Sequence, residues 1–165
     1  MKAACGYKTV FMSPRTPEPP IRILFVCQAN LCRSPLAKVI AQLALGDGVV
    51  AESAGVAPSP SRMPDEGIEM IRRLSGADAS GHRPRFVLDF PLDEFDYIIG
   101  MDSSVFMRLS GMPQVPKDKL YGWEISDPCG LGLDAYEQTA GQIERYLDQF
   151  LQNREMEKRP LKKRP

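Results

Sequence analysis

The chain has 165 residues, of which 43% are hydrophobic and 25% charged, a composition typical of one globular domain with its own core. Its 21 basic and 21 acidic residues cancel, so no net field favours nucleic acid or an anionic membrane as a partner. No stretch approaches the run of about 20 apolar residues that a membrane-spanning helix needs.

The cysteines indicate a reducing compartment. The four of them, at positions 5, 27, 32 and 129, are unevenly spaced, and the first residues do not resemble a secretory signal peptide. We therefore expect free thiols and a cytoplasmic protein. The single histidine, His82, argues against a Cys-His protease and against a zinc site. We expect no metal and no cofactor.

The two ends of the chain differ from its middle. Residues 1–20 lack periodicity and carry four prolines, which predicts a disordered extension. Residues 153–165 end in a basic, proline-containing stretch and are expected to be a disordered tail. Residues 21–152 then form the one predicted domain.

The domain begins with a predicted strand, helix and strand. The apolar, β-branched run at 21–26 is typical of a strand buried on both faces of a parallel sheet. Ser34 and Pro35 are suited to a first helical turn, and the helix they open should end near residues 46–48. Residues 49–53 predict the second strand, and such a βαβ unit is right-handed.

The later elements complete an α/β fold. Because buried strands alternate with helical patterns, the sequence predicts a three-layer α/β/α architecture, with a four-stranded parallel twisted sheet and helices on both faces. The further predicted elements are a helix at 65–74, a strand at 97–101, a short helix at 103–109, a weak strand at 119–123 and a long amphipathic helix from about residue 133.

The junction of the first strand and the first helix carries the chemistry. Backbone N–H groups and the helix dipole make such a junction an anion site, and the same field favours the thiolate form of a cysteine there, here Cys27. Arg33, six residues later, can hold two phosphoryl oxygens at once. The other residues predicted to line this phosphate loop are Gln28, Ala29, Asn30, Leu31, Cys32 and Ser34.

A nucleophilic thiolate and an arginine predict phosphate-ester hydrolysis through a phosphocysteine intermediate. The leaving group then needs a proton, and Asp127, followed by Pro128 after the weak fourth strand, is the candidate acid. The structural alternatives are that Cys27 is a small buried hydrophobe and that the Asp-Pro pair is a simple turn.

Residues 27–35 resemble the loop of the low-molecular-weight protein tyrosine phosphatases, Cys-x-x-Asn-x-Cys-Arg-Ser-Pro. The likeness continues at 53–55, 80–85, 97–102 and 127–128, and so covers about residues 21–152. It implies that Cys27 is the nucleophile, that Arg33 holds the phosphate, and that Asp127 protonates the leaving group and then activates water. It also implies a phosphorylated protein as substrate and no catalytic metal.

The resemblance implies supporting roles as well. Asn30, Ser34, Ser53 and His82 would form hydrogen bonds that hold the loop, and the Ser34 hydroxyl would ease departure of the thiolate. Cys32 corresponds to a cysteine that traps the oxidised nucleophile in a reversible disulfide, which would protect it from further oxidation. The alternative for Cys32 is a packed cysteine at a helix start.

The substrate is left between alternatives. Many tyrosine phosphatases of this family have aromatic residues after the Asp-Pro pair, where this chain has Cys129 and Gly130, and Tyr121 and Trp123 could compensate only if the fold brings them near. This turn resembles the protein-arginine phosphatase branch, yet Leu31 stands where that branch has threonine. We expect phosphotyrosine as substrate, with phosphoarginine as the alternative.

Two other readings stay open. Arsenate reductases share the loop but pass a disulfide along further cysteines, a role open to Cys129 only if it approaches Cys27 or Cys32. A module that binds phosphate without turnover is the non-enzymatic alternative. The sequence does not determine the oligomeric state.

Overall fold

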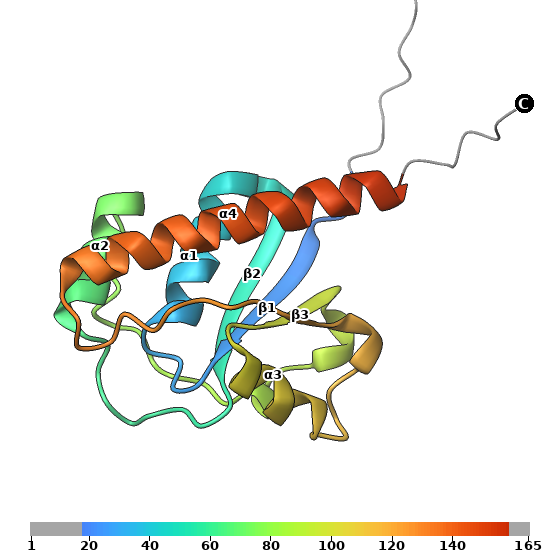
Figure 1. The fold of residues 1–165 in the computed structure, drawn as a ribbon, viewed down its shortest axis with the longest axis horizontal. Coiled ribbons are helices and arrows are strands. Elements are labelled where there is room, and N and C mark those ends of the chain that lie inside the picture. The colour runs from blue at the N-terminus through green and yellow to red at the C-terminus, as the bar shows by residue number, and fades with distance from the viewer. Residues whose placement is uncertain (1–17, 159–165) are drawn as a thin grey trace, which may run out of the picture.

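The computed structural model of the protein describes residues 18–158, with side chains described as far as residue 154. The expectations of disorder for residues 1–17 and 159–165 therefore lie outside the described residues. Four parallel strands form one sheet in the order β2-β1-β3-β4, of which Figure 1 labels the first three. The strands are β1 (Ile21–Cys27), β2 (Val49–Gly55), β3 (Tyr97–Gly100) and β4 (Leu120–Gly122).

The helices lie close to their predicted positions. They are α1 (Arg33–Leu45), α2 (Asp65–Ser75), α3 (Ser103–Ser110) and α4 (Leu133–Lys158), the long red helix of Figure 1. Four short 3-10 helices, which periodicity did not predict, are η1 (Gly46–Gly48), η2 (Val87–Asp89), η3 (Leu92–Glu94) and η4 (Lys117–Lys119). Helix α4 continues six residues past Gln152, where the predicted domain ends.

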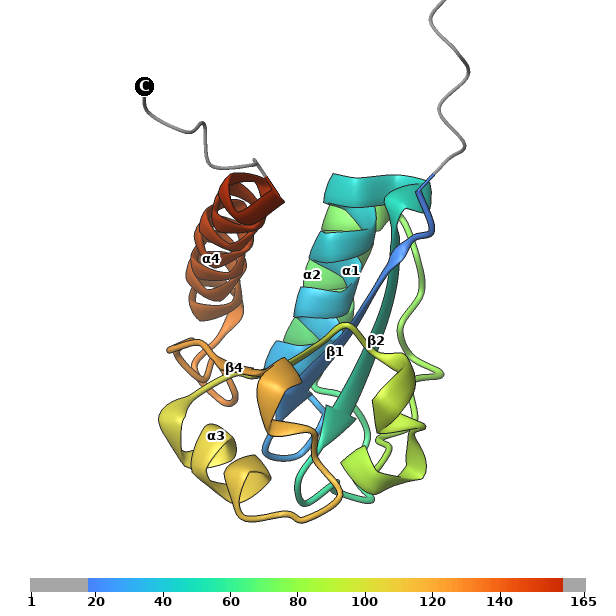
Figure 2. The same ribbon diagram turned by 90° about the vertical axis from the view of Figure 1, so that its right-hand side faces the viewer.

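The sheet separates two apolar cores. On β1, Ile23 and Phe25 pack in the core formed with α1, α2 and α4, whereas Leu24 and Val26 pack in the core formed with α3 and the η2–η3 segment. Alternate residues of a strand point to opposite faces, so a continuously apolar strand must be covered on both sides. Helices α1 and α2 pack against each other on one face of the sheet, and α2 lies behind α1 in Figure 2. The predicted three-layer α/β/α fold is confirmed.

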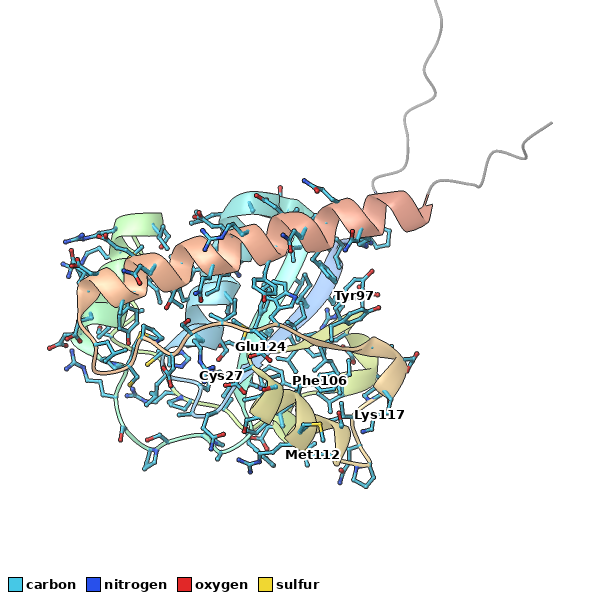
Figure 3. The ribbon with its side chains drawn as sticks, viewed as in Figure 1. Cys27, Tyr97, Phe106, Met112, Lys117 and Glu124 are labelled. Carbon is cyan, nitrogen blue, oxygen red and sulfur yellow. The ribbon has the colours of Figure 1, made fainter. Side chains whose placement is uncertain are left out.

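Strand order fixes the place of the nucleophile. Because β1 lies between β2 and β3, with Cys27 paired to Gly55 and Val26 paired to Gly100, the first strand ends at the centre of the sheet's carboxyl edge. Figure 3 labels Cys27 there. Ligands of open parallel sheets bind at this edge, where the order of the strands reverses.

Helix α3 approaches the sheet closely. A Cβ atom added to Gly100 would lie 3.2 Å from the Cα of Phe106, and one added to Gly122 would lie 3.1 Å from its Cδ2. Phe106, labelled in Figure 3, therefore packs where β3 and β4 carry no side chain. Among the described residues, no helix is both long and apolar enough to span a bilayer.

Candidate active site

Asn30 shapes the loop between β1 and α1. It is fully buried and has a φ of 58°, the left-handed conformation that asparagine tolerates better than most residues. Its Nδ2 donates to the hydroxyls of Ser34 at 2.9 Å and Ser53 at 3.0 Å, and its Oδ1 accepts the N–H of Arg85 at 2.9 Å. All side-chain polar atoms of Asn30 are thereby satisfied, so the loop is held in one conformation.

His82 supports the same loop from outside. Its Nε2 lies 2.7 Å from the carbonyl oxygen of Asn30, so that nitrogen carries the donated proton. Burial lowers the pKa of His82, and the hydrogen bond to Asn30 offsets this only in part. A neutral His82 that donates from Nε2 is the form that this arrangement favours.

The sulfur of Cys27 contacts a hydroxyl. Cys27 is 3% exposed, and its Sγ lies 3.0 Å from the Oγ of Ser34. That Oγ also lies 3.1 Å from the carbonyl oxygen of Ala54. One hydroxyl proton serves one acceptor at a time, so Ser34 donates either to Ala54 or to the Cys27 thiolate.

The guanidinium of Arg33 is buried and contacts residues that follow β3 and β4. Its Nη1 donates to Asp102 Oδ2 at 2.5 Å and to the carbonyl oxygen of Ile125 at 3.2 Å, while its Nη2 lies 3.7 Å from Asp127 Oδ2. Burial alone would raise the pKa of the Asp102 carboxyl, but the N–H of Val105 and the Arg33 cation outweigh it and hold this pKa low.

Asp102 is the functional residue that the sequence did not identify. It follows β3 at the same edge of the sheet as Cys27 and caps α3, accepting the N–H of Val105 at 2.8 Å. An acidic residue after a buried strand and before a serine was the available signal. Its second oxygen orients Arg33, a contact that no local pattern reveals.

The loop after Asp127 brings a third thiol to the site. Asp127 Oδ1 accepts the N–H of Cys129 at 3.1 Å, and a carboxylate oxygen of Asp127 lies within 4.8 Å of the Sγ atoms of both Cys32 and Cys129. The Cys32 Sγ accepts a hydrogen bond from the Tyr136 hydroxyl at 3.1 Å. Burial raises the pKa of Cys32 to about 12.

Seven of the predicted site residues line a hollow of about 100 Å³, together with Cys129. No aromatic side chain contributes to its lining among the described residues. Trp123 packs in the core against Phe25 and Tyr146. Tyr121 packs against Tyr97 and Phe150. Neither residue therefore takes the place of the aromatic residues that are missing after Asp127. The lining residues are Cys27, Gln28, Ala29, Leu31, Cys32, Arg33, Asp127 and Cys129.

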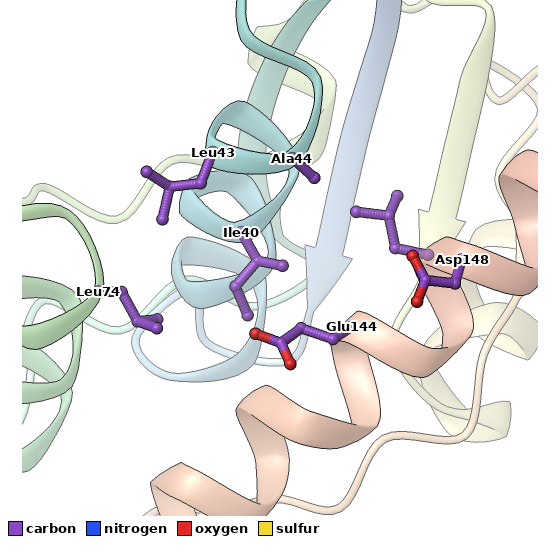
Figure 4. A pocket seen from close by; sticks show the side chains of 7 residues that line it. Ile40, Leu43, Ala44, Leu74, Glu144 and Asp148 are labelled. Atoms are coloured by element: carbon purple, nitrogen blue, oxygen red, sulfur yellow. The ribbon is translucent and has the colours of Figure 1, made fainter.

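A larger groove of about 330 Å³ lies between α1, α2 and α4 (Figure 4). Its walls are the apolar side chains of Ile40, Leu43, Leu74 and their neighbours, with the carboxylates of Glu144 and Asp148 at one side. It is formed by the C-terminal half of α1, whereas the phosphate loop precedes the N-terminus of that helix. It offers no nucleophile, so its size does not make it the active site.

The family model of the low molecular weight phosphotyrosine protein phosphatases matches residues 22–162. The chain belongs to this family. One relative, the low molecular weight protein-tyrosine-phosphatase YfkJ of Bacillus subtilis, is 39% identical over 98 residues, which cover 56% of this chain and 63% of that protein. The match to YfkJ thus spans a little under two thirds of its length.

Two further relatives extend over more of the chain. The protein-arginine-phosphatase of Geobacillus stearothermophilus is 27% identical over 148 residues, covering 84% of this chain and 99% of that protein. The crystal structure of a low molecular weight protein tyrosine phosphatase from T. tengcongensis superposes with a TM-score of 0.70 at 30% identity, covering 81% of this chain and 99% of that one.

Proposed function

We propose that the protein is a tyrosine phosphatase that hydrolyses phosphotyrosine in phosphorylated proteins through a phosphocysteine intermediate. The observation that carries the proposal is the convergence of the Cys27 thiol, the Arg33 guanidinium and the Asp127 carboxylate on one small hollow. The free thiols of the described residues and the phosphoprotein substrates of the family support a cytoplasmic location.

In the first step, the Cys27 thiolate attacks phosphorus while the tyrosyl oxygen leaves and takes a proton from Asp127. Arg33 stabilises the charge on the equatorial oxygens, and N–H groups of the loop and of the α1 N-terminus would add further donors to them. Asp102 keeps the guanidinium of Arg33 in place from behind.

In the second step, Asp127, now a carboxylate, removes a proton from water as the water oxygen attacks phosphorus. The P–S bond breaks, inorganic phosphate leaves and Cys27 returns to its thiolate. The hydroxyl of Ser34, 3.0 Å from the sulfur, donates to the departing thiolate and stabilises its charge. This cycle needs no metal and no cofactor.

The lining of the hollow favours an aryl phosphate over a guanidinium phosphate. Leu31 presents an apolar wall, and no aspartate or glutamate besides Asp127 contributes to the lining among the described residues. A guanidinium group would need polar partners for its N–H groups, since an unpaired buried donor costs about 1–3 kcal/mol. The similarity to the Geobacillus protein-arginine-phosphatase keeps phosphoarginine as the second candidate.

Matched peptides that carry phosphotyrosine or phosphoarginine at one position test the choice. We expect kcat/KM for the phosphotyrosine peptide to be higher, and the reverse order would favour the arginine phosphatase. Failure of both peptides and of p-nitrophenyl phosphate to turn over, with retained phosphopeptide binding, would instead indicate the non-catalytic module.

Arsenate reduction is a third candidate, because the Sγ of Cys129 lies within 4.8 Å of the Cys32 Sγ. A relay of disulfides from Cys27 through Cys32 to Cys129 would be needed, and Cys27–Cys32 pairing itself stays a prediction. Oxidation of reduced thioredoxin or glutaredoxin that depends on arsenate would reveal this activity. We expect none above the rate of a Cys129→Ser variant.

A further inference from the structure

We propose that Cys32, Cys129 and Asp127 form a binding site for a thiophilic divalent cation of the zinc type, and that an ion bound there inhibits the phosphatase. Two sulfur atoms and a carboxylate oxygen from two separate loops lie within 4.8 Å of one another. Hydrolysis uses only one of these three groups, the Asp127 carboxylate. The two thiols have no part in the proposed reaction.

The chemistry of the three ligands selects the ion. Cysteine thiolates bind zinc and other soft cations, whereas magnesium and calcium prefer oxygen ligands. Zinc takes four tetrahedral ligands at about 2.3 Å to sulfur and 2.0–2.2 Å to oxygen, which separates neighbouring ligand atoms by roughly 3.6–3.8 Å. To bind the ion, the three ligand atoms must therefore approach one another by about 1 Å or less. A water molecule would fill the fourth position.

The loop after Asp127 has room for this movement. Asp127 and Cys129 are both exposed, whereas Cys32 is 7% exposed and fixed by the Tyr136 hydroxyl. Gly130, the next residue, has a φ of +76° and nothing within 4 Å of the position of a Cβ atom. The exposed ligands, Asp127 and Cys129, can thus move toward the buried Cys32. The bound cation displaces the thiol protons.

Inhibition follows from the position of the site and rests on the proposed function. An ion bound by the Asp127 carboxylate removes the proton donor of the first step and the base of the second. Cys32, Asp127 and Cys129 also line the hollow in which the phosphoryl group would lie. The ion would therefore both disable the acid and narrow the entrance.

Binding is measured without any catalysis in the full-length Cys5→Ser/Cys27→Ser protein, which leaves Cys32 and Cys129 as its two thiols. Cd²⁺ is the probe, because cadmium thiolates absorb in the ultraviolet, and a phosphine keeps the thiols reduced. We expect one equivalent to bind with thiolate absorption and Mg²⁺ to fail to compete. If Cd²⁺ produces no thiolate absorption, the proposal of a cation site at Cys32, Cys129 and Asp127 is wrong.

Single substitutions in this background locate the ion. Cys32→Ser and Cys129→Ser should each weaken Cd²⁺ binding by about tenfold or more, and Asp127→Asn should also weaken it. The matched control is Asp134→Asn, an exposed carboxylate at the start of α4. Cys129 is exposed, so a loss of affinity in Cys129→Ser reports the missing ligand and not a disturbed core. Unchanged affinity in this variant would contradict the proposal.

A second arm tests inhibition with Zn²⁺ in the Cys5→Ser protein, where Cys27 is intact. The zinc concentration that halves p-nitrophenyl phosphate hydrolysis should rise about tenfold or more in Cys129→Ser. An unchanged value would overturn the inhibitory role. If the protein hydrolyses no phosphate ester, the proposed function fails, while the cadmium measurement still decides the binding site.

Discussion

Arg33 donates to Asp102 at 2.5 Å, and this pair joins the phosphate loop to the end of β3 across 69 residues of sequence. The guanidinium is buried, with 6% of its side chain exposed, whereas 26% of the Asp102 side chain is exposed. A buried cation needs a partner, because its desolvation is costly. Asp102 is therefore a positioning residue that holds Arg33 ready for phosphate.

Replacing Asp102 by asparagine should lower kcat/KM for p-nitrophenyl phosphate by about 100-fold, since a displacement of about 1 Å in a catalytic group has an effect of that size. Asparagine still caps α3 and its amide oxygen can still accept from Arg33, but the buried cation loses its countercharge, so the melting temperature should also fall. Asp118→Asn in η4 is the matched control. A lower melting temperature with unchanged kcat/KM would instead assign Asp102 to stability alone.

Gly55 lets β2 pass directly beneath the phosphate loop. A Cβ atom at Gly55 would lie 2.9 Å from the carbonyl oxygen of Gln28 and 3.0 Å from the nitrogen of Asn30, both backbone atoms that cannot swing away. Gly55→Ala should destabilise the protein by about 1–3 kcal/mol and weaken phosphate binding. Chemical denaturation and phosphate titration measure the two effects.

Gly48 provides the control for Gly55, because a Cβ atom there meets nothing within 4 Å. Gly48→Ala should leave phosphate binding unchanged. Equal phosphate affinity in Gly55→Ala and the wild type would mean that the loop shifts freely, contrary to the network that holds Asn30.

Local sequence patterns predicted the strands, the helices and the phosphate loop, because periodicity and residue type decide them locally. Contacts between distant segments were beyond such patterns. The Arg33–Asp102 pair, the hydrogen bond from Tyr136 to Cys32 and the burial of Trp123 depend on how the sheet and α4 are assembled. The segment between α2 and β3 lacks periodicity, so its 3-10 turns were equally hidden.

His82 should make stability depend on pH. Its pKa is lowered by burial in the folded protein, while the unfolded value is about 6.5. Between these two values the unfolded chain binds more protons, so the free energy of unfolding rises with pH. The full contribution of neutral His82 is present above about pH 6.5 and is lost as the pH falls toward the folded pKa.

Because His82 is the single histidine, a variant isolates its contribution. His82→Gln keeps a nitrogen donor for the carbonyl of Asn30 but does not titrate. Urea denaturation between pH 7 and pH 5.5 should give a shallower pH dependence for the variant. Parallel curves for the two proteins would show that carboxylates, and not His82, cause the slope.

The loss of activity on replacing Asp127 should depend on how readily the leaving group departs without a proton. Asp127→Asn should slow hydrolysis of phenyl phosphate by about 10²–10⁴-fold, the usual contribution of general acid catalysis. Hydrolysis of p-nitrophenyl phosphate should suffer less, because nitrophenolate leaves readily without a proton. Values of kcat/KM on both esters measure the difference, because kcat/KM reports the steps up to phosphocysteine formation and not its hydrolysis. Equal losses in kcat/KM would exclude Asp127 as the proton donor.

Ser34 should govern the second chemical step. The thiolate that departs from phosphorus is stabilised by the Ser34 hydroxyl at 3.0 Å, and a hydrogen bond to a charged group is worth roughly 1.5–3 kcal/mol. Ser34→Ala should therefore slow phosphocysteine breakdown by about 10- to 100-fold. Rapid mixing with p-nitrophenyl phosphate should then show a burst of nitrophenol followed by slow turnover.

Ser53→Ala is the matched control for Ser34. Both hydroxyls accept from Asn30 Nδ2, at 2.9 Å for Ser34 and 3.0 Å for Ser53, but only Ser34 touches the sulfur of Cys27. A loss that arises from loosening of the loop should appear in both variants, whereas a loss that arises from thiolate stabilisation should appear only in Ser34→Ala. Bursts of equal size in the two variants would therefore assign the Ser34 hydroxyl to holding Asn30 and not to the departure of the thiolate.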